Sequence, residues 1–201
     1  YPVHRLDRTT QGLMLYAKTA EGAKRLSAAV QKNEVQKIYH AVAEGAPDPP
    51  HGEMTDLLFF DRRRGKSYVV TRERKGVKRA KLSYQTLSSA EKDGKTLSLL
   101  RITLETGRTH QIRVQLATRR HPIVGDRRYG SSVSCMNIML CAAELHFDHP
   151  FTGERLDFYH YADNDYFWLF ENPGILSSMS AIRFDDISVF SFTHRFYSNC
   201  E

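Results

Sequence analysis

The sequence predicts an α+β fold, built on a mixed, mostly antiparallel sheet with flanking helices and hairpins. Two observations support this prediction. Several segments alternate β-branched and aromatic residues with polar ones, while few segments repeat apolar residues at helical spacing. At 201 residues, the chain has the length of one domain, or of one domain with a tail.

Two helices are expected. The first lies between residues 19 and 33, because alanine, leucine and valine recur there at helical spacing. The second is a short helix over residues 109–119, with Ile112 and Leu116 on one face and Arg113 near its side.

Strands are expected at residues 35–44 and 96–105, where the pattern alternates. Residues 54–90 predict further strands joined by hairpins, because glycine follows or precedes basic residues at 64–66 and 75–77 in the manner of tight turns.

The charge of the chain favours an anionic partner. Lysine and arginine total 29 against 23 acidic residues, which gives a net charge of +6 and a pI near 9.3. A dense basic block lies within the predicted hairpins, and we expect it to contact a nucleic-acid backbone, although a solvated surface is the simpler alternative. Its members are Arg62, Arg63, Arg64, Lys66, Arg72, Arg74, Lys75, Lys78, Arg79 and Lys81.

The three cysteines, Cys135, Cys141 and Cys200, show no CxxC spacing. Neither a disulfide framework nor a zinc cluster is therefore predicted, and a reducing cytoplasm fits best. No long apolar run predicts a membrane span.

The segment from His4 to Arg8 places the carboxylate of Asp7 between two arginines. Neighbouring positive charge favours the ionised carboxylate, which suits a nucleophile or a stabiliser of positive charge. If the segment is extended, Arg5 and Asp7 share one face and Leu6 points to the other. A solvated surface ion pair is the alternative reading of this segment alone.

Together with four later blocks, this segment resembles the RluA-type pseudouridine synthases. The five blocks occur in the family's order: HRLDRTTQGL at residues 4–13, QKIYHA at 36–41, GRTHQIRV at 107–114, HPIVGD at 121–126 with YG at 129–130, and LCAAELHFDHP at 140–150.

The resemblance covers roughly residues 3–160. It implies a catalytic domain at residues 1–170 that lacks the N-terminal segment usual in the family, followed by a C-terminal extension of unknown role at residues 171–201. Gln11, Gln115 and Cys141 depart from the residues common in the family, and none of them is a proposed catalytic group.

The resemblance implies an isomerase that converts specific uridines in rRNA or tRNA to pseudouridine, without a cofactor or a metal. Asp7 would act as the nucleophile, on either the ribose or the base. Arg113 would supply its counter-charge, because a buried carboxylate needs one. Tyr39 would pack on the uracil and help remove the C5 proton.

Further residues would contact the RNA. Arg5 is implied to fill the space that the flipped uridine leaves, while Arg108 and His110 would contact the substrate or order the pocket. Gly12 and Gly107 are interpreted as positions that serve backbone geometry. We expect a monomer in the cytoplasm, with RNA as its partner and no membrane.

Two alternatives stay open. The first is a non-catalytic RNA-binding module or RNA chaperone derived from this fold, whose RNA binding would not depend on Asp7. The second is a glycosidase, which fits less well because no second catalytic carboxylate at a suitable separation is evident.

Overall fold

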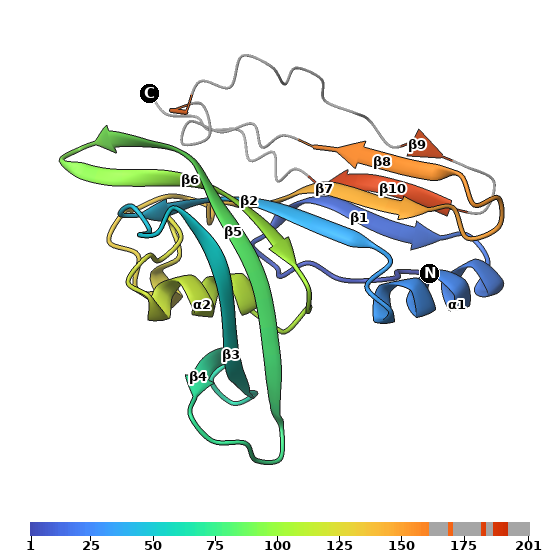
Figure 1. Cartoon of the computed structure of the whole chain (residues 1–201), viewed down its shortest axis with the longest axis horizontal. Helices are drawn as coiled ribbons and strands as arrows, with labels where there is room; N and C mark the ends of the chain where they lie inside the picture. The colour runs from blue at the N-terminus through green and yellow to red at the C-terminus, as the bar shows by residue number, and fades with distance from the viewer. Residues whose placement is uncertain (161–168, 171–181, 184–186, 193–201) are drawn as a thin grey trace.

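The computed structural model describes residues 1–160, 169–170, 182–183 and 187–192 (Figure 1). Within these ranges the chain forms one sheet and two α-helices. The strands are β1 (Gln11–Ala17), β2 (Gln36–Glu44), β3 (His51–Asp61), β4 (Lys66–Val70), β5 (Val77–Lys92), β6 (Lys95–Leu104), β7 (Leu140–Asp148), β8 (Arg155–Tyr159), β9 (Ile182–Arg183) and β10 (Ile187–Phe192). The helices are α1 (Ala20–Gln31), α2 (Gln111–Thr118) and the 3₁₀ turn η1 (Arg127–Tyr129).

The sheet is mixed and mostly antiparallel, which confirms the predicted α+β class. Its strand order is β4-β3-β5-β6-β2-β7-β1-β10-β9, and β8 pairs with β7. The parallel pair is β1 with β7, near the centre of the sheet, where Gln11 lies opposite Cys141 and Gly12 opposite Ala142. Both helices lie below the sheet in the view of Figure 1.

The two predicted helices are confirmed. The hydroxyl of Thr19 caps α1 by accepting a hydrogen bond from the amide of Gly22 at 3.0 Å, and the chain leaves the helix at Asn33, whose φ is 60°. Leu26 packs from α1 against Leu15 of β1 and Phe147 of β7 in one apolar core. Helix α2 belongs to the second, larger core.

That larger core surrounds the centre of the sheet. Ile112 and Leu116 of α2 pack there with Tyr39 of β2, Ile102 of β6 and Leu140 of β7. The core therefore fixes α2 and Tyr39 in the same part of the molecule.

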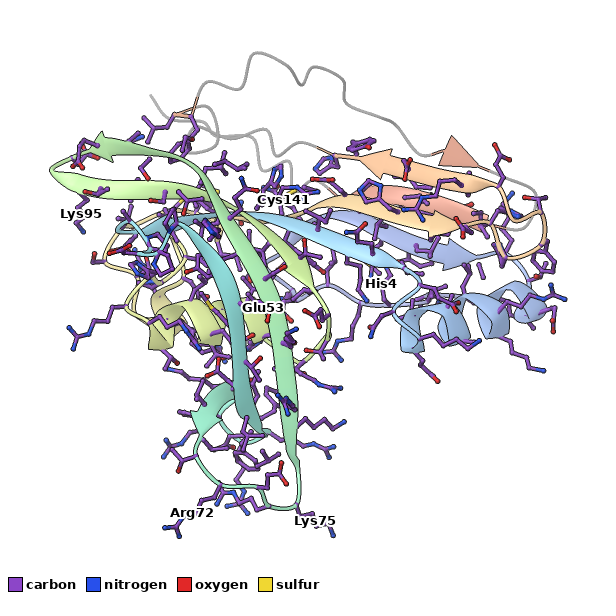
Figure 2. All side chains as sticks on the ribbon, viewed as in Figure 1. His4, Glu53, Arg72, Lys75, Lys95 and Cys141 are labelled. Carbon is purple, nitrogen blue, oxygen red and sulfur yellow. The ribbon has the colours of Figure 1, made fainter. Side chains whose placement is uncertain are left out.

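The strands β3, β4 and β5 extend away from the body as an arm (Figure 1). We define the basic arm as residues 57–81, a segment that holds ten lysines and arginines and two acidic residues. Its net positive charge therefore exceeds the +6 of the whole chain. Figure 2 shows Arg72 and Lys75 at its tip.

Three differences from the predicted elements stand out. Residues 5–7, whose extended form was left conditional, lie outside any strand, and a turn follows at residues 8–9, where the amide of Thr10 donates to the carbonyl of Asp7 at 2.9 Å. Strands β1 and β8 were not predicted. Within the expected C-terminal extension, β10 pairs with β1 along residues 187–192, while Cys200 lies outside the described residues.

Cys135 and Cys141 are free thiols. In the part of the chain that the structure describes, no helix is long and apolar enough to cross a membrane, and no group of acidic, histidine or cysteine side chains could hold a metal ion.

Gly12 holds β1 against β7 at the point where the chain leaves the Asp7 segment. Its φ is +113°, and a Cβ at this position would overlap the backbone carbonyl of Ala142. The interpretation of Gly12 as a position of backbone geometry is therefore confirmed.

We predict that Gly12→Ala lowers the free energy of unfolding by about 2 to 5 kcal/mol, from backbone strain together with overlap in a packed site. Gly94→Ala is the matched control, because Gly94 also has a positive φ but open space around it. The control should lose about 1 to 2 kcal/mol. Urea denaturation measures both, and equal losses would contradict the role of the Ala142 contact.

Candidate active site

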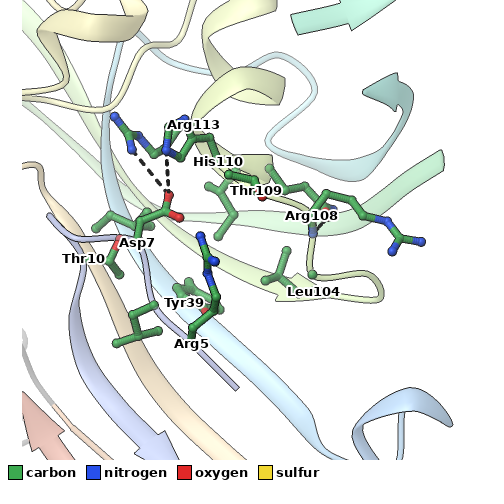
Figure 3. Close-up of a pocket in the computed structure, with 14 residues that line it drawn as sticks. Arg5, Asp7, Thr10, Tyr39, Leu104, Arg108, Thr109, His110 and Arg113 are labelled. Atoms are coloured by element: carbon green, nitrogen blue, oxygen red, sulfur yellow. Dashed lines mark hydrogen bonds and ion pairs between the residues drawn. The ribbon is translucent and has the colours of Figure 1, made fainter. Parts of the chain in front are cut away.

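A pocket of about 210 Å³ lies where the N-terminal segment meets the start of α2 (Figure 3). Asp7 lies on one wall and the 107–113 segment on another, with Tyr39 of β2 beside them. All six site residues predicted from the sequence line this pocket: Arg5, Asp7, Tyr39, Arg108, His110 and Arg113.

The Asp7 carboxylate faces Arg113 of α2 and His110, the residue that precedes α2. Arg113 Nη1 donates to Asp7 Oδ2 at 3.4 Å, and His110 Nε2 lies 3.9 Å from the same oxygen. The Asp7 side chain keeps 18% of its surface exposed. The carboxylate is therefore held beside a cation while it stays accessible from the pocket.

Arg113 makes its strongest contacts with a residue to which the sequence analysis gave no role. Its Nε and Nη2 donate to the two carboxylate oxygens of Asp126 at 2.6 and 2.9 Å, and Asp126 is 1% exposed. Burial alone would lower the pKa of Arg113, but the hydrogen bonds and the charge of Asp126 outweigh it, so the pKa is raised. The forked pair leaves Nη1 to face Asp7.

Tyr129 completes the support of this arginine. Its ring lies under the Arg113 guanidinium at 5.0 Å, and its hydroxyl lies 2.9 Å from His110 Nδ1. The amide of Ser67 donates to the same hydroxyl oxygen at 2.8 Å. The Tyr129 hydroxyl also lies 3.4 Å from the Ser67 carbonyl, so Tyr129 links His110 to β4, while His110 Nε2 is the ring nitrogen on the side of Asp7.

The backbone of His110 aims this imidazole. His110 precedes α2 in the left-handed region, at φ 55° and ψ 26°, which is uncommon for a residue with a side chain. Burial lowers the pKa of His110, an effect that the nearby charge of Asp7 opposes in part. His110 is accordingly neutral near pH 7.

Tyr39 is 8% exposed and sits at an irregularity of the sheet. The register between β2 and β7 shifts between Ile38 and Tyr39, and such bulges redirect side chains next to active sites. Burial, with a smaller contribution from Asp7, raises the pKa of Tyr39 well above its usual value. Its phenol therefore stays protonated near pH 7.

The two predicted RNA contacts lie differently. Arg5 is exposed at the mouth of the pocket, and its guanidinium forms no hydrogen bond or ion pair with the residues that the structure describes (Figure 3). Arg108 instead points away from Asp7, and its Nε donates to the carbonyl of Arg79 on the basic arm at 3.0 Å. Leu6 packs against the larger core and also lines the pocket, together with Arg5 and Asp7.

Sequence reasoning missed Asp126 and Tyr129 as members of the site. Both stand in a block that was recognised, HPIVGD with YG, but they were given no role. A signal was present, because an arginine on a buried helix requires a carboxylate partner.

The fold and the pocket together define an α+β protein in which the accessible carboxylate of Asp7 lines the pocket beside Arg113. This arginine is buried and is held by two hydrogen bonds to Asp126. A family model described as RNA pseudouridylate synthase matches residues 1–118. The chain is also 33% identical over 172 residues to tRNA pseudouridine synthase C of Yersinia pestis, and the match covers 78% of this chain and 66% of that protein. The ribosomal large subunit pseudouridine synthase D of Vibrio cholerae is 36% identical over 172 residues, covering 78% of this chain and 51% of that protein.

Solved structures show the same fold. Human RNA pseudouridylate synthase domain containing 1 superposes with a TM-score of 0.70 at 22% identity, covering 80% of this chain and 68% of that one. Human RNA pseudouridylate synthase domain containing 4 gives a TM-score of 0.69 at 23% identity, covering 84% and 73%. The chain belongs to the RNA pseudouridylate synthase family, within which it resembles the RluA-type enzymes. It spans less than two thirds of the length of the curated relatives described above.

His4 anchors the segment that carries Asp7. Its Nε2 accepts a hydrogen bond from the amide of Leu15 at 3.1 Å, which requires a neutral ring. Burial, with a contribution from the charge of Lys37, lowers the pKa of His4 to about 4. Between pH 6.5 and 4 the unfolded chain therefore binds a proton at this position that the folded chain does not.

We predict that the free energy of unfolding falls as the pH is lowered from 6.5 to 4. In His4→Gln the total fall over this range should be smaller by about 2 to 3 kcal/mol. His51→Gln is the control, because His51 is exposed. Urea denaturation at a series of pH values measures the slopes, and identical slopes for wild type and His4→Gln would contradict the prediction.

Proposed function

We propose that this chain isomerises uridine to pseudouridine in rRNA or tRNA, with Asp7 as the nucleophile and without a cofactor or metal. The observation that carries the proposal is the accessible carboxylate of Asp7 beside Arg113, whose own position is fixed by Asp126. The family to which the chain belongs and the names of its relatives support the reaction class.

The reaction breaks the bond between C1′ and N1, turns the uracil and joins C1′ to C5; the C5 proton is released and N1 takes up a proton. No atom is oxidised and no group is donated from outside, so a carboxylate nucleophile suffices. If Asp7 adds to C1′ of the ribose, C5 of the uracil displaces it as the new carbon–carbon bond forms; if it adds to the base, it leaves by elimination after that bond has formed.

Arg113 and Tyr39 have separate roles in this proposal. Arg113 keeps the attacking carboxylate charged in a half-buried site and fixes its direction. Tyr39 packs against the uracil. Because the pKa of Tyr39 is raised, its phenolate is disfavoured, and a role as the base that removes the C5 proton requires that the phenol first pass its own proton to another group.

A stacked uridine must leave its helix to reach this pocket, which costs a few kcal/mol. Arg5 has a free guanidinium at the pocket mouth, so we propose that it stacks in the space that the base leaves. We propose that the basic arm binds the RNA backbone, since its exposed cations neutralise phosphate charge. The protein would act as a monomer in the cytoplasm.

We predict that Asp7→Ala and Asp7→Asn reduce tritium release from [5-³H]uridine in unmodified tRNA and rRNA transcripts by at least about 10⁴-fold, because the nucleophile is lost. RNA binding should persist within a few fold. Asp148→Ala is the matched control, because Asp148 is an exposed carboxylate on β7.

Undiminished release by the Asp7 variants would contradict the proposed nucleophile. If the wild-type chain binds the transcripts but releases no tritium, the alternative of an RNA-binding module or RNA chaperone is favoured instead.

A further inference from the structure

Three cavities meet at Gly107. The first is the pocket of Asp7. A second cavity, of about 670 Å³, lies between the basic arm and residues 107–109, and we call it the arm cavity. The third, of about 470 Å³, lies on the other side, beside His4 and Lys37. Gly107 and Arg108 line all three, so Gly107 stands at the junction.

Backbone geometry does not explain a glycine at this position. The φ of Gly107 lies outside the left-handed region, and a Cβ added to it would meet no atom within 4 Å. The sequence interpretation of Gly107 as a position of backbone geometry is therefore wrong, in contrast to Gly12. Ordering a glycine in a loop costs more conformational entropy than ordering other residues. A reason for glycine at this position therefore has to lie in what the open space beside it accommodates.

The loop around Gly107 is held firmly. Gln111, which is 3% exposed, accepts hydrogen bonds at Oε1 from the Thr106 hydroxyl at 2.8 Å and from the Arg108 amide at 3.0 Å. Its Nε2 donates to the carbonyl of Lys81 at 3.0 Å. Gly107 is exposed, and both of its chain neighbours, Thr106 and Arg108, are held by Gln111. The open space beside Gly107 is therefore kept in place by these hydrogen bonds.

The arm cavity suits a nucleotide. Its volume falls within the range of small-molecule sites. Phe59 and Phe60 supply apolar rings, while four cations line the same cavity: Arg62, Arg63, Lys78 and Arg108.

Asp61, the one acidic residue that lines the arm cavity in the part of the chain that the structure describes, is hydrogen-bonded to the backbone of the neighbouring turn. Asp61 Oδ1 accepts from the amides of Arg63 and Arg64 at 2.9 and 3.1 Å. The Arg74 guanidinium lies over the Phe59 ring at 4.7 Å, and the cavity combines aromatic side chains with four cations against one acid among the described residues, which matches a base and its phosphate.

We propose that the RNA strand leaving the target uridine crosses the bare face of Gly107 and places the adjacent nucleotide in the arm cavity. The missing side chain of Gly107 then leaves room for the substrate backbone to pass. Arg108, which is hydrogen-bonded to the arm through the carbonyl of Arg79, lines both the pocket of Asp7 and the arm cavity. This inference rests on the proposed function, since it takes the pocket of Asp7 as the site of the target uridine.

The test is a graded series, Gly107→Ala and Gly107→Leu, with Gly52→Ala as control. Gly52 also lacks a positive φ, and a Cβ there makes ordinary contact with Tyr84, away from the pocket of Asp7. Tritium release from [5-³H]uridine in unmodified tRNA and rRNA transcripts gives apparent KM and kcat. Fluorescence anisotropy with the same transcripts gives Kd, and thermal unfolding gives Tm.

We expect apparent KM and Kd to rise progressively, by about tenfold or more for Gly107→Leu, while kcat changes by less than about twofold. The Tm values and the Gly52→Ala variant should match wild type. Unchanged KM and Kd in Gly107→Leu would overturn the proposed path. If wild type releases no tritium, the proposed function fails, while Kd still tests the path: a loss of binding in Gly107→Leu supports it and an unchanged Kd overturns it.

Discussion

The structure of the site depends on one buried cation. Arg113 comes from a helix that the core encloses, and it would be costly there without a partner. Asp126 provides that partner through two short hydrogen bonds, which fix the plane of the guanidinium and leave one edge for Asp7. Three segments far apart in the sequence, around residues 7, 113 and 126, are thereby joined at one point. The geometry of Asp7 follows from this pairing.

Backbone constraints bring those segments together. Gly12 allows β1 to lie against β7, so the Asp7 segment enters the pocket from the centre of the sheet. The irregular register at Tyr39 and the left-handed backbone of His110 set the directions of two further side chains that line the pocket. Each constraint is local, and those at Tyr39 and His110 act on residues that line the pocket of Asp7. The site is therefore assembled by unusual backbone conformations held in place by a well-packed core.

Much of this could be predicted from the sequence. Helix α1 and strands β2 and β6 follow from periodicity, and the residues around Asp7 follow from the resemblance to the family. What could not be predicted depends on three-dimensional context. Strand β1 shows no apolar–polar alternation in the sequence, because Met14 and Tyr16 on its less buried side are also apolar or aromatic. The pairing of Arg113 with Asp126 joins residues that no pattern connects. The open space beside Gly107 cannot be predicted from the sequence, because a glycine in a sequence usually indicates a turn.

The most direct test of this account is the turnover of Asp126→Asn, measured where circular dichroism shows the variant folded. The substitution keeps the volume of the side chain but removes the charge that holds Arg113. We predict that kcat falls by about 10²-fold, because the guanidinium no longer holds Asp7 in the direction required by its proposed role as nucleophile, while the Kd for RNA stays within about twofold. A kcat within a few fold of wild type would contradict the central role of the Arg113–Asp126 pair.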